Sequence, residues 1–265
     1  MRWTRSSWRS KIYINRHWIA SAIFRRWTNP MPKPMNERLR LASIEITQRC
    51  NRQCEYCEQT KSDREMSVAQ FDDLLDTLTT EGVEAIALGG GEPTLHSALP
   101  DLLGIARRHG LRAGLTTNAR APDLVLSLTD AGLLESFGVS AGKGEWTAMV
   151  AHPRAIVNLL LLHNGQADVM QWAVEAIQRG ARCLLLLGYK GNCSEFVPST
   201  SALSDVFRLL TLLGRKTNVT IAADDYTRRR LGLAQTCGEG FARFQMDGSR
   251  DSCCFPSCEY RAGQH

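Results

Sequence analysis

The sequence predicts an α/β fold built on a parallel sheet. Short apolar stretches alternate along the chain with longer stretches whose apolar residues recur at helical spacing. This alternation is typical of strands that are buried on both faces and are joined by crossover helices. Six such units are expected within residues 41–190. Because the functional groups of parallel barrels gather where the strands end, we expect one site at that edge.

The individual elements follow from the same periodicity. The expected strands are 41–47, 83–88, 111–117, Ser136–Ser140, Ile156–His163 and Arg182–Leu187. Ser67 is expected to cap a first helix that ends near Thr79. Further helices are expected at Ser97–His109 and near 122–131, 144–151 and 167–179, and a helix at 201–213 and a strand at 219–223 come after the sixth unit.

Three cysteines directly follow the first expected strand. Cys50, Cys54 and Cys57 form a C-x3-C-x2-C spacing, and three thiolates on one tight loop can hold three irons of a [4Fe–4S] cluster. A structural zinc site needs four nitrogen or sulfur ligands, and neither a His nor a fourth Cys lies close to this loop in sequence. Disulfides need an oxidising compartment, whereas nine cysteines with iron-binding spacing indicate a reducing, cytoplasmic location. We therefore predict an iron–sulfur cluster with one open iron.

A glycine-rich segment follows the second expected strand. Gly89, Gly90 and Gly91 precede Glu92 and Pro93. Glycines at a strand end let a ligand approach the backbone closely, and the carboxylate is suited to pair with a ligand ammonium. The structural alternative is a simple turn between strand and helix. A dinucleotide fingerprint is excluded, because the G-x-G-x-x-G spacing is absent.

Together, the cysteine triad and the Gly-Gly-Gly-Glu-Pro segment resemble the radical S-adenosylmethionine (SAM) superfamily. The resemblance covers roughly residues 41–190. It implies an open, partial (β/α)6 TIM-like barrel in which Cys50, Cys54 and Cys57 hold the cluster that binds SAM. It also implies that the 89–92 segment contacts the amino group of SAM.

The resemblance extends to polar residues at later strand ends. Thr116-Thr117-Asn118 is similar to the superfamily's TNG-type strand end, with Ala119 in place of the final Gly. By their positions Asn118, Ser140 and Asn158 are then candidates to bind SAM. For Ser140 and Asn158 the alternative is a polar group that is already satisfied at a strand end.

Four more cysteines surround a predicted hairpin near the carboxyl end. Asp247-Gly248 between short alternating runs is a strong hairpin signal. The surrounding cysteines are Cys237, Cys253, Cys254 and Cys258. This arrangement resembles the twitch or shortened SPASM region of some radical SAM enzymes, which holds an auxiliary [4Fe–4S] cluster. A zinc ribbon is the alternative. Neighbouring side chains of an extended chain point to opposite faces, so we expect only one of Cys253 and Cys254 to ligate, with Cys183 or Cys193 as a further candidate.

The first 36 residues differ in composition from the rest of the chain. They hold eight basic residues and no acidic one, so the overall formal charge of +5 becomes −3 over the remainder. A basic segment rich in Trp is suited to an anionic membrane surface, to nucleic acid or to a partner, and a disordered leader is the simplest reading. We therefore divide the chain into a leader (1–36), a radical SAM core (41–190) and a cysteine-bearing extension (191–265). No apolar run is long enough to span a membrane.

The resemblance implies an enzyme that cleaves SAM reductively to a 5′-deoxyadenosyl radical, which then abstracts a hydrogen from the substrate. The electron would come from an external one-electron reductant of the flavodoxin or ferredoxin type. Superfamily members with such an extension mostly modify ribosomally made peptides, so maturation of a peptide or natural product is the predicted function. Peptide binding would then use the leader or a separate recognition partner.

A glycyl-radical activase stays open as an alternative to peptide maturation, since it would share the cysteine triad, but it would need no cysteines around the hairpin. Three further alternatives also stay open. The first is a dehydrogenase of small sugars or alcohols, and the second is an enzyme that modifies nucleotides or RNA, for which the basic leader would be useful. The third is a non-enzymatic iron–sulfur electron carrier or sensor. Glu92 and its glycines argue against the carrier, because a carrier has no use for an ammonium pocket.

Overall fold

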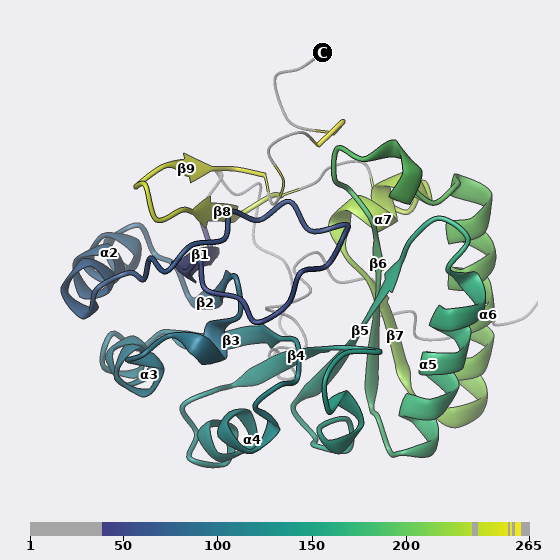
Figure 1. Cartoon of the computed structure of the whole chain (residues 1–265), viewed down its shortest axis with the longest axis horizontal. Coiled ribbons are helices and arrows are strands. Elements are labelled where there is room, and N and C mark those ends of the chain that lie inside the picture. The colour runs from purple at the N-terminus through teal and green to yellow at the C-terminus, as the bar shows by residue number, and fades with distance from the viewer. Residues whose placement is uncertain (1–38, 235–237, 254, 256–257, 261–265) are drawn as a thin grey trace, which may run out of the picture.

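A single curved sheet organises the molecule, with helices packed along its outer side (Figure 1). The computed structural model describes residues 39–234, 238–253, 255 and 258–260. The sheet has the strand order β7-β6-β5-β4-β3-β2-β1-β8-β9. All neighbouring strands run parallel except β8 and β9, which form an antiparallel hairpin. The result is the open, mostly parallel α/β sheet that the sequence predicts.

The strands match the predicted apolar stretches closely. They are β1 (Leu41–Thr47), β2 (Ala85–Gly90), β3 (Arg112–Thr117), β4 (Ser136–Ser140), β5 (Ala155–Leu161), β6 (Cys183–Gly188), β7 (Thr220–Ala223), β8 (Phe241–Phe244) and β9 (Arg250–Asp251). The helices are α2 (Val68–Thr80), α3 (Leu99–Arg108), α4 (Pro122–Asp130), α5 (Gln166–Gln178), α6 (Thr200–Thr217) and α7 (Asp225–Arg230). Short 3-10 helices lie at η1 (Pro93–Leu95), η2 (Trp146–Ala148) and η3 (Ser194–Phe196).

One predicted helix is wrong. The stretch 144–151 forms only the short 3-10 turn η2. Gly142 and Gly144 adopt φ of +71° and +51°, which lie outside the helical range and favour a turn. The segment is therefore a loop that leads from β4 to β5 rather than a crossover helix.

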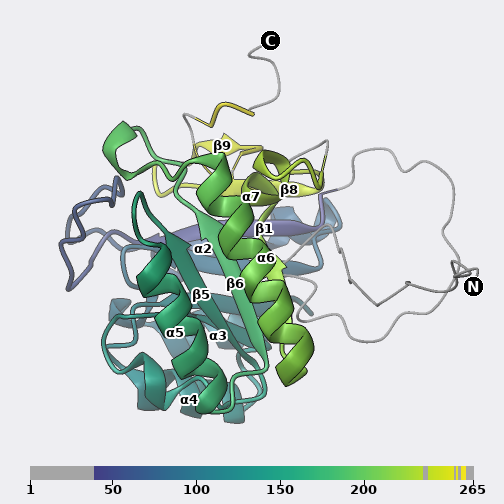
Figure 2. The same ribbon diagram turned by 90° about the vertical axis from the view of Figure 1, so that its right-hand side faces the viewer.

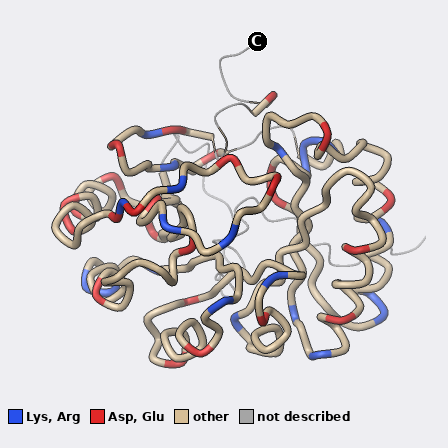
Figure 3. Tube along the Cα trace, viewed as in Figure 1, with Lys and Arg blue, Asp and Glu red and all other residues tan. Residues whose placement is uncertain are grey.

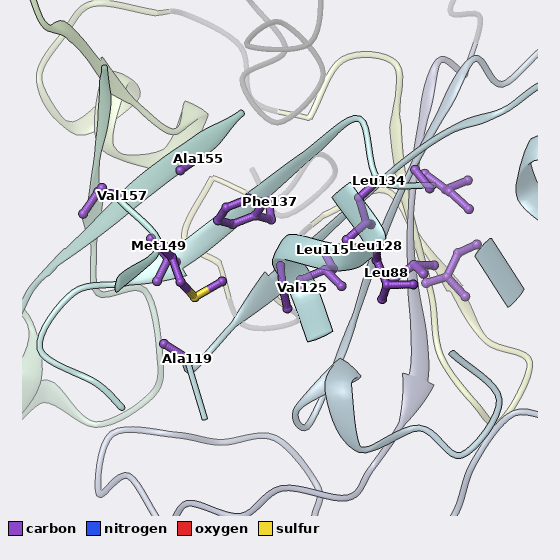
Figure 4. Close-up of a cluster of buried hydrophobic side chains, with 14 of the residues drawn as sticks. Leu88, Leu115, Ala119, Val125, Leu128, Leu134, Phe137, Met149, Ala155 and Val157 are labelled. Atoms are coloured by element: carbon purple, nitrogen blue, oxygen red, sulfur yellow. The ribbon is translucent and has the colours of Figure 1, made fainter. Parts of the chain in front are cut away.

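The main core lies between the sheet and the outer helices. Leu88 and Leu115 on the strands and Val125 and Leu128 on α4 gather with Phe137 in one buried cluster (Figure 4). The helices meet the sheet because their apolar residues fall on one side; in α2 these are Phe71, Leu75 and Leu78. Figure 2 shows α5 and α6 beside each other, outside β5 and β6.

The predicted cap of α2 is confirmed. The Ser67 side chain accepts a hydrogen bond from the Gln70 backbone N–H, and the Gln70 side chain accepts one from the Ser67 N–H at 2.9 Å. This reciprocal pair is a capping box, which fixes where the helix begins. The cysteine loop must therefore return to the sheet before residue 67.

The inner face of the sheet carries two small apolar clusters of its own. Leu41, Ala85 and Ala87 pack with Phe241, and Ile156, Leu185 and Ala222 form a second group. Because side chains alternate along a strand, the residues two positions further on also face inward. Gly89 near the end of β2 and Asn158 in the middle of β5 therefore lie on the inner face, and Asn158 is level with Ser140, the last residue of β4.

The last strands continue the barrel sheet beyond the six expected units. β7 pairs with β6, and β8 pairs with β1 in parallel register. The Asp247-Gly248 hairpin is present, with Gly248 at a φ of +83° between β8 and β9. Elements of the predicted 191–265 extension thus form both edges of the sheet.

Charged side chains lie mostly on the helices, the loops and the β8–β9 hairpin (Figure 3), and among β2–β7 only β3 carries one, Arg112. Within the residues that the structure describes, every helix is too short or too polar to cross a lipid bilayer. The predicted leader, residues 1–36, lies outside the described residues.

Candidate functional site

The three motif cysteines lie on the long loop between β1 and α2, which crosses in front of the barrel (dark blue in Figure 1). Backbone bonds close the base of this loop: the Gln48 N–H donates to the Arg64 carbonyl at 2.9 Å, and the Met66 N–H donates to Ile46 at 2.8 Å. Cys50, Cys54 and Cys57 are free thiols of intermediate burial. The structure therefore presents all three at the carboxyl end of β1, as predicted.

The glycine segment lies directly against the backbone at the start of the cysteine loop. Gly90 has a φ of +117°, and a Cβ there would overlap the carbonyl oxygen of Thr47. A Cβ on Gly91 would overlap the carbonyl oxygen of Arg49. At Gly89, in contrast, no heavy atom lies within 4 Å of the Cβ position. Two of the three glycines are thus required by the backbone of the cysteine loop, and one faces open space.

Glu92 is the organising group between β2 and β3. Its side chain is buried, and its Oε1 accepts hydrogen bonds from the Thr94 and Thr117 hydroxyl groups, each at 2.8 Å. Its Oε2 accepts the Asn118 backbone N–H at 2.7 Å. A carboxylate oxygen has two lone pairs, so Oε2 keeps capacity for a further donor. The predicted contact of Glu92 with a ligand ammonium stays a prediction.

Asn118 and Asn158 each present a buried acceptor that has no partner in the described residues. The Asn118 Nδ2 donates to the Asn51 side chain at 2.9 Å, which leaves its Oδ1 without a hydrogen bond. The Oδ1 of Asn158 is likewise buried and unpaired. Buried polar atoms are normally satisfied, so each such atom needs an explanation. A polar ligand bound near the carboxyl ends of β3 and β4 would supply the missing donors.

The side chain of Asn158 occupies space on the inner face that is open because its neighbour Gly138 has no side chain. Asn158 pairs in register with Ser140, the last residue of β4. A Cβ on Gly138 would lie 2.7 Å from the Asn158 Nδ2 and 2.9 Å from the Thr116 hydroxyl. Ser140 and Asn158 are thus brought together, while Asn118 lies nearer to Glu92. The predicted SAM-binding roles of all three residues stay predictions.

Ala119 adopts a backbone conformation that glycine favours. Ala119 has a φ of +59°, in the left-handed region. Its carbonyl oxygen accepts the Glu145 N–H at 2.8 Å, so the loop after β4 packs onto this turn. The departure from the TNG pattern therefore places an alanine in a turn of the kind that glycine normally occupies.

The pKa of the Cys54 thiol depends on its burial and on the polar and charged groups beside it, Lys143 and Tyr56 among them. Burial by itself raises the pKa of the Cys54 thiol, but the positive charge of Lys143 and the hydrogen bonds from Tyr56 and Arg52 outweigh it and lower the pKa. The Lys143 ammonium lies 4.8 Å from the centre of the Tyr56 ring. Burial, together with the nearby Cys54 and Cys57, raises the pKa of the Tyr56 hydroxyl. A lowered thiol pKa favours the thiolate, which is the form that ligates metal.

The donor set fits an iron–sulfur cluster by its chemistry. Three unpaired thiols on one loop are the ligands such a cluster uses. Among the described residues, no three Cys, His, Asp or Glu side chains already converge in a metal-binding arrangement. The three thiols therefore share one loop, but in this structure they do not form a finished small-ion site.

The C-terminal cysteines lie in a different environment. Cys253 and Cys258 are 6% and 1% exposed and pack with Tyr226 in a small cluster that Phe255 and Tyr260 extend. Burial, more than the neighbouring Glu259, raises the pKa of Tyr226 to about 12. Cys237 and Cys254 lie outside the described residues. Whether this region holds a second cluster or zinc stays a prediction.

Cys183 and Cys193, the further candidates, lie at opposite ends of β6. Cys183 begins the strand and pairs in register with Thr220 at the start of β7, whereas Tyr226 follows the end of β7. Cys193 lies in the loop beyond β6 and precedes η3. Of the two, only Cys193 is at the end of the sheet where the other cysteines lie.

Sequence reasoning missed three residues that shape the site. Thr117 and Asn51 complete the contacts of Glu92 and Asn118, and Glu58 joins the cysteine loop to the loop after β6. Thr117 lies inside the strand-end segment and Asn51 inside the cysteine motif, so their positions were a usable signal. Glu58 gave no such signal, because its partner Tyr189 is 131 residues away.

Comparisons with known proteins agree with this geometry. Residues 44–143 match the model of the Radical SAM superfamily. The PqqA peptide cyclase of Streptomyces rochei is 34% identical over 151 residues, which are 47% of this chain and 41% of that protein. The S-adenosylmethionine-dependent nucleotide dehydratase of Selenomonas ruminantium is 33% identical over 78 residues, or 29% of this chain and 28% of that protein.

Solved structures support the fold. SuiB of Streptococcus suis, bound to its precursor peptide SuiA, superposes with a TM-score of 0.68 at 13% identity, covering 82% of this chain and 60% of SuiB. The chain thus spans less than two thirds of the length of these relatives. The matched segment begins in β1 and ends in the loop after β4, so it contains the cysteine triad, the glycine segment and Asn118. Over residues 44–143, the segment that holds the cysteine triad, this chain is therefore similar to the Radical SAM superfamily.

Proposed function

We propose that this protein is a radical SAM enzyme that matures a ribosomally made peptide or peptide-derived natural product. The observations that support the proposal are three free thiols on the loop after β1, an open position at Gly89, and the unpaired oxygens of Asn118, which bonds to that loop through Asn51, and of Asn158. A metal alone would need the thiols but not the amide acceptors. The combination fits a cluster together with a polar ligand.

Each part of the site then has a task. Cys50, Cys54 and Cys57 hold the [4Fe–4S] cluster, while Gly90 and Gly91 let the cysteine loop lie close to β2. Gly89 leaves room for SAM, and Glu92 fixes the two strand ends that flank it. When bound, the cluster and SAM supply one-electron cleavage of the S–C5′ bond and a 5′-deoxyadenosyl radical, as cofactors rather than side chains carry such chemistry. The protein positions the reactants and excludes water.

The peptide substrate is favoured by the relatives. PqqA peptide cyclase is named for a peptide, and SuiB was solved with its precursor peptide. The nucleotide dehydratase match favours a nucleotide as the second candidate substrate. The proposed partners are an external flavodoxin- or ferredoxin-type reductant, the peptide and a peptide-recognition protein. The proposed cysteine-bearing extension holds a second [4Fe–4S] cluster, with zinc as the alternative metal.

The first test measures cofactor chemistry. Anaerobically reconstituted protein with SAM and a strong reductant is expected to release 5′-deoxyadenosine. A Cys50/Cys54/Cys57→Ala triple variant is expected to release none, whereas Cys183→Ala, a cysteine loss outside the motif, retains it. Iron content is expected to fall from about eight to about four per chain in the triple variant. Iron binding without any 5′-deoxyadenosine would favour an electron carrier.

The second test addresses the substrate. Co-expression with a precursor peptide encoded beside the gene is expected to change the mass of that peptide by a loss of hydrogens. Nucleoside triphosphates are the comparison substrates. An unchanged peptide together with stimulation of 5′-deoxyadenosine release by a nucleotide would replace peptide maturation with the nucleotide reaction.

A further inference from the structure

The four residues that follow β6, Tyr189–Asn192, contact both cysteine-bearing regions of the molecule. Tyr189 and Asn192 bond to the loop that carries Cys50–Cys57. Lys190, between them, bonds to the turn that leads into α7. The segment is therefore placed between two regions that are far apart in the sequence.

At the first contact, Glu58 is the receiving group. The Tyr189 hydroxyl donates to its Oε1 at 2.8 Å, and the Asn192 side-chain amide donates to its Oε2 at 2.7 Å. The Asn192 backbone N–H also donates to Oε1. Because Glu58 directly follows Cys57, these bonds fix the end of the cysteine motif. A Cβ on Gly191 would overlap both Glu58 and the Tyr189 hydroxyl, so a larger residue here would displace these two side chains.

Aromatic rings strengthen this contact. The Phe196 ring lies edge-on to Tyr56 of the cysteine motif at 6.3 Å and to Tyr189 at 5.7 Å. Such edge-to-face pairs are favourable beyond the apolar area that they bury. The cysteine loop is thus held to the loop after β6 by both polar and aromatic contacts.

At the second contact, Lys190 is the donor. Its ammonium lies 2.9 Å from Asp224 Oδ2 and 6.0 Å from the centre of the Tyr226 ring. The preceding Gly188 N–H donates to the Thr227 hydroxyl at 2.7 Å. Tyr226 packs in turn against Cys253 and Cys258. Lys190 therefore fixes the helix on which the C-terminal cysteines rest.

We propose that Glu58 and Lys190 are positioning residues that couple the two cysteine regions through Tyr189–Asn192. Lys190, which makes the second contact, directly follows Tyr189, which makes the first. A movement of the backbone at one contact therefore changes the other. Energetic coupling of this kind passes through contiguous bonded and packed groups. The coupling belongs to the chain itself and does not depend on which metal either region holds.

The test measures cysteine protection in the full-length, metal-free chain. Iodoacetamide labelling followed by mass spectrometry gives an alkylation rate for each cysteine, which reports local opening. Glu58→Ala is expected to speed alkylation of the remote Cys253 and Cys258, and Lys190→Met that of the remote Cys54 and Cys57. A rise of about twofold to thirtyfold matches the usual range of coupling between sites. Lys190→Arg, which keeps the charge near Asp224, is expected to restore most of the protection.

Two controls separate coupling from general loosening. Glu55→Ala removes an exposed carboxylate from the same loop and is expected to leave Cys253 and Cys258 unchanged. Cys183, on the far end of β6, is the internal reference. An effect of Glu58→Ala confined to the motif cysteines, or an equal rise at Cys183, would overturn the proposal. Since neither iron nor SAM is needed, failure here is distinguishable from failure of the proposed activity.

Discussion

The two cysteine-bearing regions differ in how deeply their cysteines are buried. Cys50, Cys54 and Cys57 are only partly buried and lie on a loop held by backbone bonds, polar side chains and the edge-to-face contact of Tyr56 with Phe196. Cys253 and Cys258 are buried against aromatic rings. A thiolate is disfavoured in an apolar setting unless a metal compensates it, whereas a nearby cation favours it. The comparison teaches that the first region is prepared to bind a ligand, while the second is an integral part of the packing.

The largest expected effect concerns the backbone contact beneath the first region. Gly91→Ala forces a Cβ onto the Arg49 carbonyl, which a rigid backbone cannot avoid. We expect this variant to lower the free energy of unfolding by about 2 to 4 kcal/mol. Thermal and denaturant unfolding of the metal-free chain measure it.

Gly89→Ala is the matched control for that variant. Its Cβ would meet nothing within 4 Å, so we expect stability to change by about 0.5 kcal/mol or less. The same variant is expected to weaken SAM binding by the reconstituted protein, because the methyl group occupies the open face. Equal destabilisation by both substitutions would mean that the glycine segment does not support the loop as described.

The next prediction compares the cysteines themselves. Cys258→Ala removes the sulfur of a residue that is 1% exposed. We expect the free energy of unfolding of the metal-free chain to fall by about 1 to 2 kcal/mol. Cys50→Ala, at a partly exposed site, is expected to cost about 0.5 kcal/mol or less. Urea titration of both variants tests this difference. Similar losses would show that the two regions contribute equally to packing.

The third prediction uses the lysine that lowers the pKa of Cys54 in the first region. Lys143→Met removes the cation that lowers the pKa of Cys54, so the thiolate fraction at neutral pH falls. We expect Cys54 alkylation to slow by about threefold and its pH profile to shift to higher pH. Because the folded-state pKa lies below that of free cysteine, the thiolate favours the folded chain at alkaline pH, and this contribution disappears as the pH falls through the folded pKa. An unchanged profile would contradict the assigned cause.

Sequence patterns predicted the strands well because their signal is local. β1 and β4 have the expected bounds, and the other predicted strands shift by one or two residues at most ends. The positions of the motif cysteines and glycines were also predictable, because the cysteines come after β1 and the glycines lie at the end of β2. Their roles as ligands stay predictions. The helix predicted at 144–151 was wrong because the apolar residues of this stretch are buried in a turn. Gly142 and Gly144, which have positive φ, keep the chain out of the helical conformation where the stretch begins.

Long-range contacts set the limit of prediction. The pairing of β8 with β1 joins residues about two hundred positions apart, and neither strand carries a pattern that names its partner. The same holds for Glu58 and Tyr189, where a glutamate in a polar loop and a tyrosine after a strand look ordinary when taken alone. The unpaired Asn118 and Asn158 oxygens became visible only in the structure, because whether a buried acceptor is satisfied depends on every neighbour.

The smallest expected effect concerns how the hairpin of the second region is attached. Arg250 on β9 bonds to Glu81 at the end of α2 at 2.8 Å, but the two side chains are 48% and 32% exposed. Exposed ion pairs contribute little, so Glu81→Gln is expected to cost about 0.5 kcal/mol at low salt and less at high salt. Glu55→Gln, an exposed carboxylate in the cysteine loop, is the control for the change in net charge. A loss above about 1 kcal/mol, persisting at high salt, would mean that this pair rather than the β8–β1 pairing holds the hairpin to the barrel.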